Sequence, residues 1–405
     1  MKILYISTVC SKKKYDELFK LCNGNLLHSI QNFHTSILNC LNDENNVTAL
    51  SGIPISPKQT KKRIFKVSRD KENNIEYISP FFINLYIIKN IFMIFGIIYY
   101  TLKWVIANRK DKNLRIIIDS AYVSVAPIVV FFAKVFKIPI VAIVADIYDY
   151  MFLNVNKNHD TNLFNIVMSK ILSYCWKNYD GFIFLTEPMN NLLNRKSKPY
   201  KIIEGFASDL IDVNNVKKNN KKIILYAGGL LEKYGILNLI KAFLKFDSED
   251  YELHFYGSGE LVDKIIAYSN EYDNIKYLGN IRHDELQKKY AEAFLLVNPR
   301  GNDAEYTKYS FPSKTIDYLL SGTPVLTVKL FGIPEEYYQY LYSIDDNNVN
   351  TICNKLLEIS NKSEEELKMI GKNGQKFILN NKSKNYQSKK INDLLIKVGD
   401  EKNEC

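Results

Sequence analysis

The chain alternates short apolar runs with longer amphipathic segments along its whole length. The apolar runs have the length of buried strands, and the segments between them have the spacing of helices. This alternation is typical of parallel βαβ units, in which helices cover both faces of a sheet. Strands are predicted at residues 2–7, 115–119, 138–145 and 181–186, and again at 222–227, 251–256, 275–279, 294–298 and 324–328.

A polar stretch at residues 212–222 separates the two series of predicted strands. We therefore predict an α/β protein with two doubly wound, Rossmann-like domains, a first at residues 1–211 and a second at residues 212–383. A last amphipathic segment, about residues 384–405, is predicted to pack back on the first domain. Ligands of such folds bind beyond the carboxyl ends of the strands, so the two parallel sheets are expected to face a central cleft.

Another hydrophobic feature, residues 81–106, is long enough to cross a bilayer as one helix. Lys89, Asn90 and Lys103 argue against crossing, and the strand predicted at 115–119 needs a sheet on the same side. Two alternatives remain open for this segment. It is either a helix docked on a membrane surface or a helix packed in the core.

Positive charge is distributed unevenly along the chain. Residues 1–200 hold 26 Lys and Arg against 14 Asp and Glu, whereas the remainder holds 28 against 30. Many of the excess cations directly precede the apolar stretch, which favours peripheral contact with an anionic membrane over binding of nucleic acid. These cations are Lys58, Lys61, Lys62, Arg63, Lys66, Arg69 and Lys71.

The composition also excludes several classes of protein. The six cysteines are scattered, without the spacing of a zinc site or a redox dithiol, and a reduced cytoplasmic protein is expected. The first residues become polar too soon for a signal peptide. A dinucleotide oxidoreductase is disfavoured because no Gly-x-Gly-x-x-Gly turn follows the first predicted strand.

The first candidate site is the loop at residues 226–235 (YAGGLLEKYG), between a predicted strand and a helix at 236–246. Glycines such as Gly228 and Gly229 let backbone amides approach a phosphate, and Lys233 can supply a full positive charge. A diphosphate could bind there without a metal. The alternative is an ordinary turn that needs glycine for its geometry.

The second candidate site is the segment at residues 309–325 (YSFPSKTIDYLLSGTPV), which reads as a loop, a short helix and a strand. Lys314 and Asp317 are three residues apart and share a face of this helix. The lysine can meet phosphate oxygens, and the carboxylate can accept hydrogen bonds from two ribose hydroxyls. The alternative is an exposed ion pair within the helix.

This segment resembles the donor site of retaining GT-B glycosyltransferases of family four, in which a glutamate, a short helix and Gly-x-Pro-Val recur. Asp317 occupies the position of the glutamate, and residues 321–325 (SGTPV) contain the Gly-x-Pro-Val pattern. Other landmarks of the family follow in order over the whole second domain. They are the phosphate loop at 228–235, the Gly-x-Gly turn containing Gly257, the base-binding loop ending at Arg282, and the strand at 294–299.

The resemblance implies a fold and a reaction. The fold is GT-B, and the reaction moves a sugar from a nucleotide-sugar donor to an acceptor with retention of configuration. The nucleotide-sugar is a co-substrate, and no metal or other cofactor is expected. Together with the basic first domain, the family implies a lipid-linked saccharide acceptor in bacterial capsule, exopolysaccharide or lipopolysaccharide synthesis.

The chemistry of the residues, together with the resemblance, gives roles to particular positions. Lys233, Lys314 and Asp146 are the catalytic candidates, the lysines because the departing diphosphate needs positive charge. In retaining members no protein nucleophile is generally assigned, and the leaving phosphate accepts the acceptor's proton. The donor-binding candidates are Gly228, Gly229, Gly257, Arg282, Tyr309, Ser310, Phe311 and Asp317.

The chain departs from the family pattern at several positions. The first of two expected glutamates is Tyr309, for which Glu305 is a candidate substitute. The usual arginine and lysine of the phosphate loop align with Gly229 and Tyr234. Two rival interpretations therefore stay open. One is a catalytically impaired binding or partner subunit with the same fold, and the other is a sugar-nucleotide epimerase that needs no acceptor.

The acceptor side of the site rests on the first domain, where the resemblance is looser. Asp146 and Asp149 end a strongly apolar strand, where a carboxylate could orient an acceptor hydroxyl or simply cap the next helix. His34, on a helix predicted at residues 30–41, is a third acceptor-binding candidate. For this histidine a packed or exposed structural position is the favoured alternative.

Overall fold

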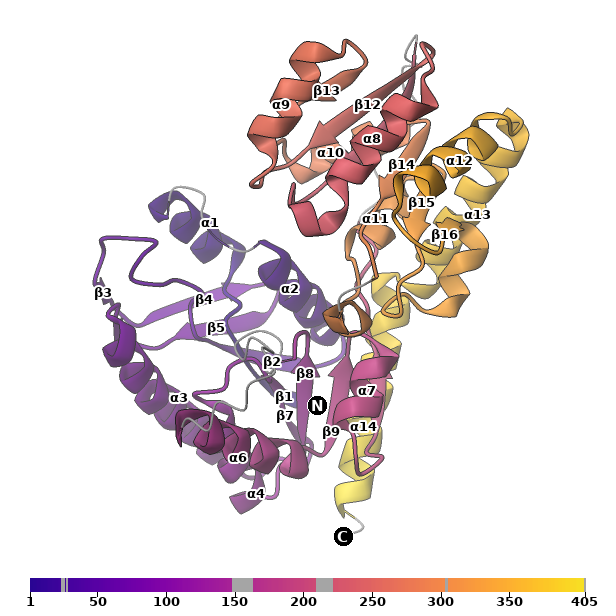
Figure 1. Cartoon of the computed structure of the whole chain (residues 1–405). Helices are drawn as coiled ribbons and strands as arrows, with labels where there is room; N and C mark the ends of the chain where they lie inside the picture. The colour runs from indigo at the N-terminus through magenta and orange to yellow at the C-terminus, as the bar shows by residue number, and fades with distance from the viewer. Residues whose placement is uncertain (23–25, 27, 148–162, 209–220, 303–304, 404–405) are drawn as a thin grey trace. The chain divides into compact units, whose positions relative to one another are not determined.

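The computed structural model describes residues 1–22, 26, 28–147, 163–208, 221–302 and 305–403. The chain divides into two compact units. The first comprises Met1–Ile203 and Lys384–Cys405, and the second comprises Glu204–Ser383. The boundary expected between residues 211 and 212 lies outside the described residues. Figure 1 shows a twisted sheet with its helices in each unit.

The first unit is built on an eight-stranded sheet with the order β10-β9-β8-β7-β1-β2-β5-β4. All neighbouring strands are parallel except β4 and β5, which form an antiparallel hairpin at the edge. The strands are β1 (Lys2–Ser7), β2 (Asn46–Ser51), β4 (Ser68–Glu72), β5 (Ile75–Ser79), β7 (Leu114–Asp119), β8 (Ile140–Val144), β9 (Gly181–Phe184) and β10 (Tyr200–Ile202). A separate short pair is formed by β3 (Ile64–Phe65) and β6 (Phe82–Ile83).

Helices complete the first unit. They are α1 (Lys12–Leu21), α2 (His28–Asn42), α3 (Tyr86–Asn108), α4 (Ala126–Val135), α6 (Leu163–Asn178), α7 (Glu187–Leu193) and α14 (Lys384–Asn403). The last helix contacts α2 and the strands β8, β9 and β10. Arg115 of β7 donates to the carbonyl of Leu395 at 2.8 Å, which ties α14 to the sheet. The C-terminal segment therefore belongs to the first unit (Figure 1).

The second unit contains a fully parallel six-stranded sheet with the order β13-β12-β11-β14-β15-β16. The strands are β11 (Lys222–Ala227), β12 (Tyr251–Tyr256), β13 (Ile275–Tyr277), β14 (Leu295–Asn298), β15 (Val325–Val328) and β16 (Tyr342–Ile344). Helices and 3-10 turns connect them. These are η1 (Glu232–Tyr234), α8 (Ile236–Phe246), α9 (Val262–Glu271), α10 (His283–Glu292), η2 (Glu305–Tyr309), α11 (Lys314–Leu320), η3 (Glu335–Tyr340), α12 (Val349–Ser360) and α13 (Glu364–Asn381).

Local sequence explains these elements. The strands β7, β8, β14 and β15 are buried along their whole length because helices cover both faces of a parallel sheet. Helix α8 buries Ile236, Leu239, Ile240 and Phe243, a stripe at helical spacing. Both sheets are of the doubly wound α/β type, and the predicted fold class is confirmed for each unit.

The strand order determines where ligands bind. In the second unit the order reverses between β11 and β14, which pair through Ile224 with Leu295 and Leu225 with Leu296. Helices on opposite faces diverge at such a point and leave a crevice beyond the strand ends. The loops that follow β11 and β14 therefore border the expected ligand site of this unit.

Candidate active site

The glycine turns after β11 and β12 pack directly against each other. Gly257 has a φ of 131°, and a Cβ atom at this position would lie 1.9 Å from the carbonyl oxygen of Gly228. The Gly228 amide donates to the Tyr256 carbonyl at 3.0 Å, and the Gly257 amide donates to the Gly279 carbonyl at 2.8 Å. These two amides are used within the fold, so the expectation that the Gly228 amide binds phosphate is not supported. Gly229 is the remaining candidate of the pair.

Lys314 is the first residue of α11 and turns toward the Gly228 turn. Its Nζ atom lies 4.0 Å from the centroid of the Tyr226 ring. A Cβ atom at position 228 would lie 2.5 Å from the same Nζ, so this ammonium occupies space that only glycine leaves open. Burial, with a further contribution from Arg300, lowers the pKa of Lys314 to about 7. This partly buried cation is placed to receive an anion.

Arg300 is a second cation at the same place, and the sequence analysis missed it. It follows β14 after one intervening residue and is 8% exposed. Its guanidinium lies 5.6 Å from the centroid of the Tyr234 ring. Its charge helps to lower the pKa of Lys314, which indicates that the two cations share one electrostatic environment. The one available signal was its position just after the strand at 294–298.

Lys233 takes a different position from these two cations. It lies on η1, is exposed, and its Nζ is 5.4 Å from the centroid of the Tyr234 ring. The glycine that follows, Gly235, has a φ of 74°, and a Cβ there would lie 2.2 Å from the carbonyl oxygen of Pro299. The loops after β11 and β14 therefore touch at Gly235. This is expected for neighbouring strands at the switch point, the place where the strand order reverses.

Asp317 lies one turn after Lys314 on α11 and has a different partner. Its Oδ2 atom is 3.3 Å from Nε2 of His283, the first residue of α10. The interpretation of Lys314 and Asp317 as an exposed ion pair with each other is therefore wrong: the lysine turns inward, and the carboxylate pairs with the histidine. His283 was not a candidate in the sequence analysis.

The other donor-binding candidates surround this helix. Arg282 precedes α10 and pairs with Asp284 at 2.9 Å, so its guanidinium is engaged on the surface. Tyr309 ends η2, Ser310 follows it, and both are partly buried. Phe311 is 6% exposed and packs with its ring centroid 5.5 Å from that of Tyr337. Its side chain is part of the core, and its predicted contact with the donor stays a prediction.

In the first unit, His34 is buried within a hydrogen-bonded network. Its ring is 1% exposed. The Tyr5 hydroxyl lies 2.5 Å from Nδ1, and Oδ2 of Asp119 lies 3.1 Å from Nε2. These two partners come from neighbouring strands, β1 and β7. The packed position is therefore the one observed for His34, which corrects the expectation of a direct contact with an acceptor.

Asp146 follows β8, the strand next to β7, and its residue surface is exposed. Although the residue is exposed as a whole, neighbouring atoms partly desolvate its carboxylate; this desolvation, followed by the charge of Asp119, raises the pKa of Asp146 to about 6. The carboxylate is still mostly ionised at pH 7 and can accept a hydrogen bond. Asp149, the other predicted acceptor-binding residue of this loop, lies outside the described residues.

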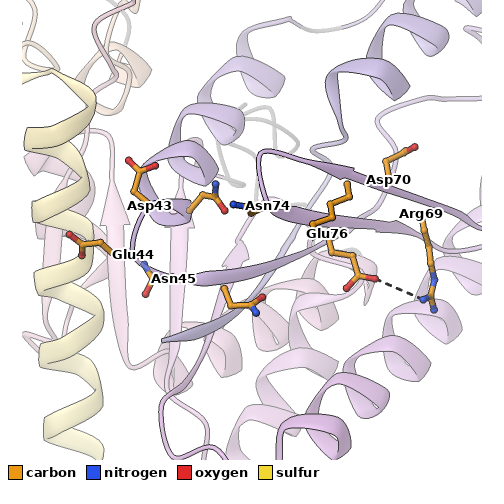
Figure 2. A pocket seen from close by; sticks show the side chains of 10 residues that line it. Asp43, Glu44, Asn45, Arg69, Asp70, Asn74 and Glu76 are labelled. Atoms are coloured by element: carbon orange, nitrogen blue, oxygen red, sulfur yellow. Dashed lines mark ion pairs between the residues drawn. The ribbon is translucent and has the colours of Figure 1, made fainter.

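A pocket of about 780 Å³ in the first unit is not part of this site (Figure 2). It lies at the amino-terminal end of β2, around Asn46, whereas ligands of parallel sheets bind beyond the carboxyl ends. Its charged side chains pair with neighbours, as Arg69 does with Glu76 at 3.9 Å and Asp43 with Lys384 at 2.8 Å. Among the described residues, no group of three or more His, Cys, Asp and Glu is placed to hold a metal.

Solved structures with the same fold include three informative ones. Sucrose-phosphate synthase from Thermosynechococcus elongatus is 13% identical over 98% of this chain and 99% of its own, with a TM-score of 0.64. A glycosyltransferase from Rickettsia africae is 14% identical over 98% of both chains, with a TM-score of 0.66. Anabaena HepE, in complex with UDP, is 13% identical over 98% of this chain and all of its own, with a TM-score of 0.59. At these identities the likeness establishes the GT-B fold.

The fold describes the whole chain, and a family match describes the second unit. The chain has the GT-B fold. Residues 208–377 match the family described as Glycosyl transferases group 1, so the second unit is a group 1 glycosyltransferase domain. A search of curated protein sequences found no significant match to the chain.

Proposed function

We propose that the chain transfers a sugar from a nucleotide-sugar donor to a lipid-linked saccharide acceptor, with retention of the anomeric configuration. The observation that carries this proposal is the pair of cations, Arg300 and Lys314, beside the glycine turn at the switch point of the second unit. Departure of a nucleoside diphosphate concentrates negative charge on its phosphates, and fixed cations in a desolvated site stabilise that charge. The structure of Anabaena HepE, which has the same fold, is a complex with UDP, and this supports a nucleotide as a ligand of the chain.

The donor residues divide by chemistry. Arg300, Lys314 and the Gly229 amide would hold the diphosphate, and exposed Lys233 would approach it from the surface. Asp317 would accept hydrogen bonds from the ribose hydroxyls. The two cations therefore replace the arginine and lysine that the resemblance places at Gly229 and Tyr234. The site keeps its positive charge although those two positions have lost it.

The acceptor chemistry is assigned to the first unit. Asp146 would accept a hydrogen bond from the attacking hydroxyl and orient it, and Asp149, three positions later in the sequence, is the second proposed acceptor-binding residue. The new glycosidic bond forms as the glycosyl phosphate bond breaks, and the leaving phosphate takes the proton of the hydroxyl. No metal is required, because the cations of the second unit neutralise the leaving group.

A membrane-bound acceptor is supported by α3, the one described helix that is long and apolar enough to cross a membrane. Only 22% of its most apolar window is buried. One face, with Met93, Ile97, Thr101 and Val105, packs into the first unit. A helix that is apolar on both faces needs a second apolar environment. The outward residues are Ile87, Ile91, Phe95, Tyr99 and Ile106.

The anchoring of α3 favours docking over crossing. Nζ of Lys89 donates to the carbonyl of Ile53 at 3.0 Å and to that of Ile55. Gly96 lies so close to Pro80 that a Cβ atom would be 2.4 Å from the proline side chain. These contacts hold the helix on its unit. We propose that its outward face and the cations at residues 58–71 together contact an anionic bilayer from the cytoplasmic side.

Vesicle sedimentation tests the membrane proposal. The double variant Ile87→Glu with Phe95→Glu should lose binding to vesicles that contain phosphatidylglycerol, because both side chains are exposed and each change places a charge in the apolar face. Met369→Glu, at an exposed apolar residue of the second unit, is the matched control. Equal binding of the double variant and the wild type would refute docking through this face.

A transfer assay tests the reaction itself. Purified protein is incubated with radiolabelled UDP-, GDP- and ADP-sugars and a membrane extract, and lipid-soluble label is counted. Transfer that requires the extract supports the proposal. Release of free UDP only when the extract is present would exclude an epimerase, and absence of both transfer and hydrolysis from every donor would favour a binding subunit.

A further inference from the structure

Asp317 is paired with His283, and the proposed function gives this histidine no role. His283 is the first residue of α10, and Asp317 lies within α11. The two helices follow different strands of the second sheet. Nε2 of His283 lies 3.3 Å from Oδ2 of Asp317. The histidine side chain is 55% exposed, and that of Asp317 is 25% exposed. The bond therefore lies at the surface of the site, where a ligand can reach the carboxylate.

Two cations near this pair, Arg282 and Lys314, are directed elsewhere, and His283 is the partner of Asp317. Arg282, one residue earlier, directs Nε and Nη2 to the two carboxylate oxygens of Asp284 at 3.1 and 2.9 Å. Lys314, on the same helix as Asp317, turns toward Tyr226. The hydrogen bond to Asp317 raises the pKa of His283, with burial acting in the opposite direction and the charges of Asp317 and Asp284 adding to the increase. Charge and geometry agree on the same pair.

A bond of this kind contributes little to folding. Exposed ion pairs add little to stability, because solvent screens them and their side chains lose freedom. The main effect of this bond is on the orientation of the Asp317 carboxylate. Aspartate is one methylene shorter than the glutamate found at this position in the family that the chain resembles. A shorter side chain has less reach for adjusting to a ligand, so the orientation of its carboxylate matters more.

We infer that His283 is a positioning residue that holds the Asp317 carboxylate toward the vicinal hydroxyls of the donor ribose. The inference rests on the proposed nucleotide site. One N–H group occupies one lone pair of Oδ2, which leaves Oδ1 and the second lone pair of Oδ2 to accept two hydroxyl hydrogens. Without the hydrogen bond from His283, the Asp317 carboxylate rotates freely, and fixing its orientation costs free energy when the nucleotide binds.

The test compares a nucleotide with its analogue that lacks both ribose hydroxyls. Calorimetry first identifies which of UDP, GDP and ADP binds the wild type most tightly, and then measures its 2′,3′-dideoxy form. The ratio of the two dissociation constants isolates the hydroxyl contribution. We expect a wild-type ratio of roughly 10 or more, because hydrogen bonds to a charged group are the stronger class. In His283→Ala the ratio should fall severalfold toward 1.

Two further variants separate positioning from general damage. His283→Gln keeps an N–H donor and should retain most of the wild-type ratio. His254→Gln removes another histidine of the second unit, one that pairs with Glu252 at 2.8 Å on β12, and should leave the ratio unchanged. A wild-type ratio in His283→Ala overturns the inference while leaving the nucleotide site intact. Failure of all three nucleotides to bind the wild type overturns the proposed site, and the inference with it.

Discussion

The ammonium of Lys314 lies 4.0 Å from the centroid of the Tyr226 ring, against a glycine turn in which a Cβ atom at position 228 would lie 2.5 Å from that ammonium. The lysine begins the helix after β14, and the tyrosine belongs to β11, so the contact spans the switch point of the second sheet. The face of an aromatic ring attracts a cation, and it lets the ammonium stay in a desolvated position. This contact brings a positive charge to the place where a diphosphate is expected.

Nucleotide binding should therefore take up a proton. Burial lowers the pKa of Lys314 to about 7 in the free protein, and a bound diphosphate should raise it again. At pH 8.5 the free lysine is mostly neutral and the bound lysine is charged. Calorimetry in buffers of different ionisation enthalpy should show uptake approaching one proton, with affinity falling as the pH rises above about 7. Lys314→Met should lose most of this uptake, and a wild type without uptake would contradict the assignment.

Arg300 should matter for turnover more than for folding. Replacing it with methionine removes a fixed charge from the leaving-group site, and loss of one such group typically lowers kcat on the order of 100-fold. Lysine at this position should recover only part of the loss, because it lacks the planar fork of donors. Lys372→Met, an exposed cation on α13, is the control for a loss of net charge. Unchanged kcat in Arg300→Met would remove this residue from the mechanism.

The close approach of Gly257 and Gly228 can be tested through stability. Alanine at 257 must fit a Cβ atom 1.9 Å from a carbonyl oxygen at a φ of 131°, whereas alanine at 279 has a φ of 74° and open space around it. Both changes bring backbone strain, about 1–3 kcal/mol, but only the first forces the two turns apart. Thermal unfolding should therefore show a larger fall for Gly257→Ala. Equal falls would mean that the turns separate at little cost.

Asp146 should give the rate a dependence on pH. Its pKa is raised to about 6, and the ionised carboxylate is the form that can orient a hydroxyl, so activity should rise with pH through about 6. Asp146→Asn should be slower and should lack this limb of the profile. A wild-type rate in Asp146→Asn at pH 7 would assign the acceptor hydroxyl to another residue.

Much of the fold could be predicted from periodicity. The strands at residues 2–7, 222–227 and 251–256 and the helix at 236–246 have the predicted bounds, because an apolar run or a stripe at helical spacing defines each one. Two features were not predicted from the sequence: β2, whose run Asn46–Ser51 is interrupted by Thr48, and the hairpin of β4 with β5. The first strand of that hairpin, Ser68–Glu72, is polar, and only its pairing with β5 makes it a strand.

The site was less predictable than the fold. Lys314 and Asp317 could be found because they lie within one recognisable segment, but the direction of each side chain depends on other strands and helices. Arg300 has no motif around it, and its importance comes from the pairing of β14 with β11. His283 likewise meets Asp317 only because α10 and α11 are neighbours in space. Local patterns cannot show such contacts between distant segments.

The most direct test of the central claim is a thermal-shift panel of UDP, GDP and ADP on the wild type and on Asp317→Ala. A ligand that binds only the folded state raises the unfolding temperature according to its concentration relative to its dissociation constant. We predict that at least one diphosphate raises the unfolding temperature of the wild type, and that Asp317→Ala, folded and with a similar unliganded temperature, shows a clearly smaller shift. Failure of all three nucleotides to stabilise the wild type at millimolar concentration would contradict the account.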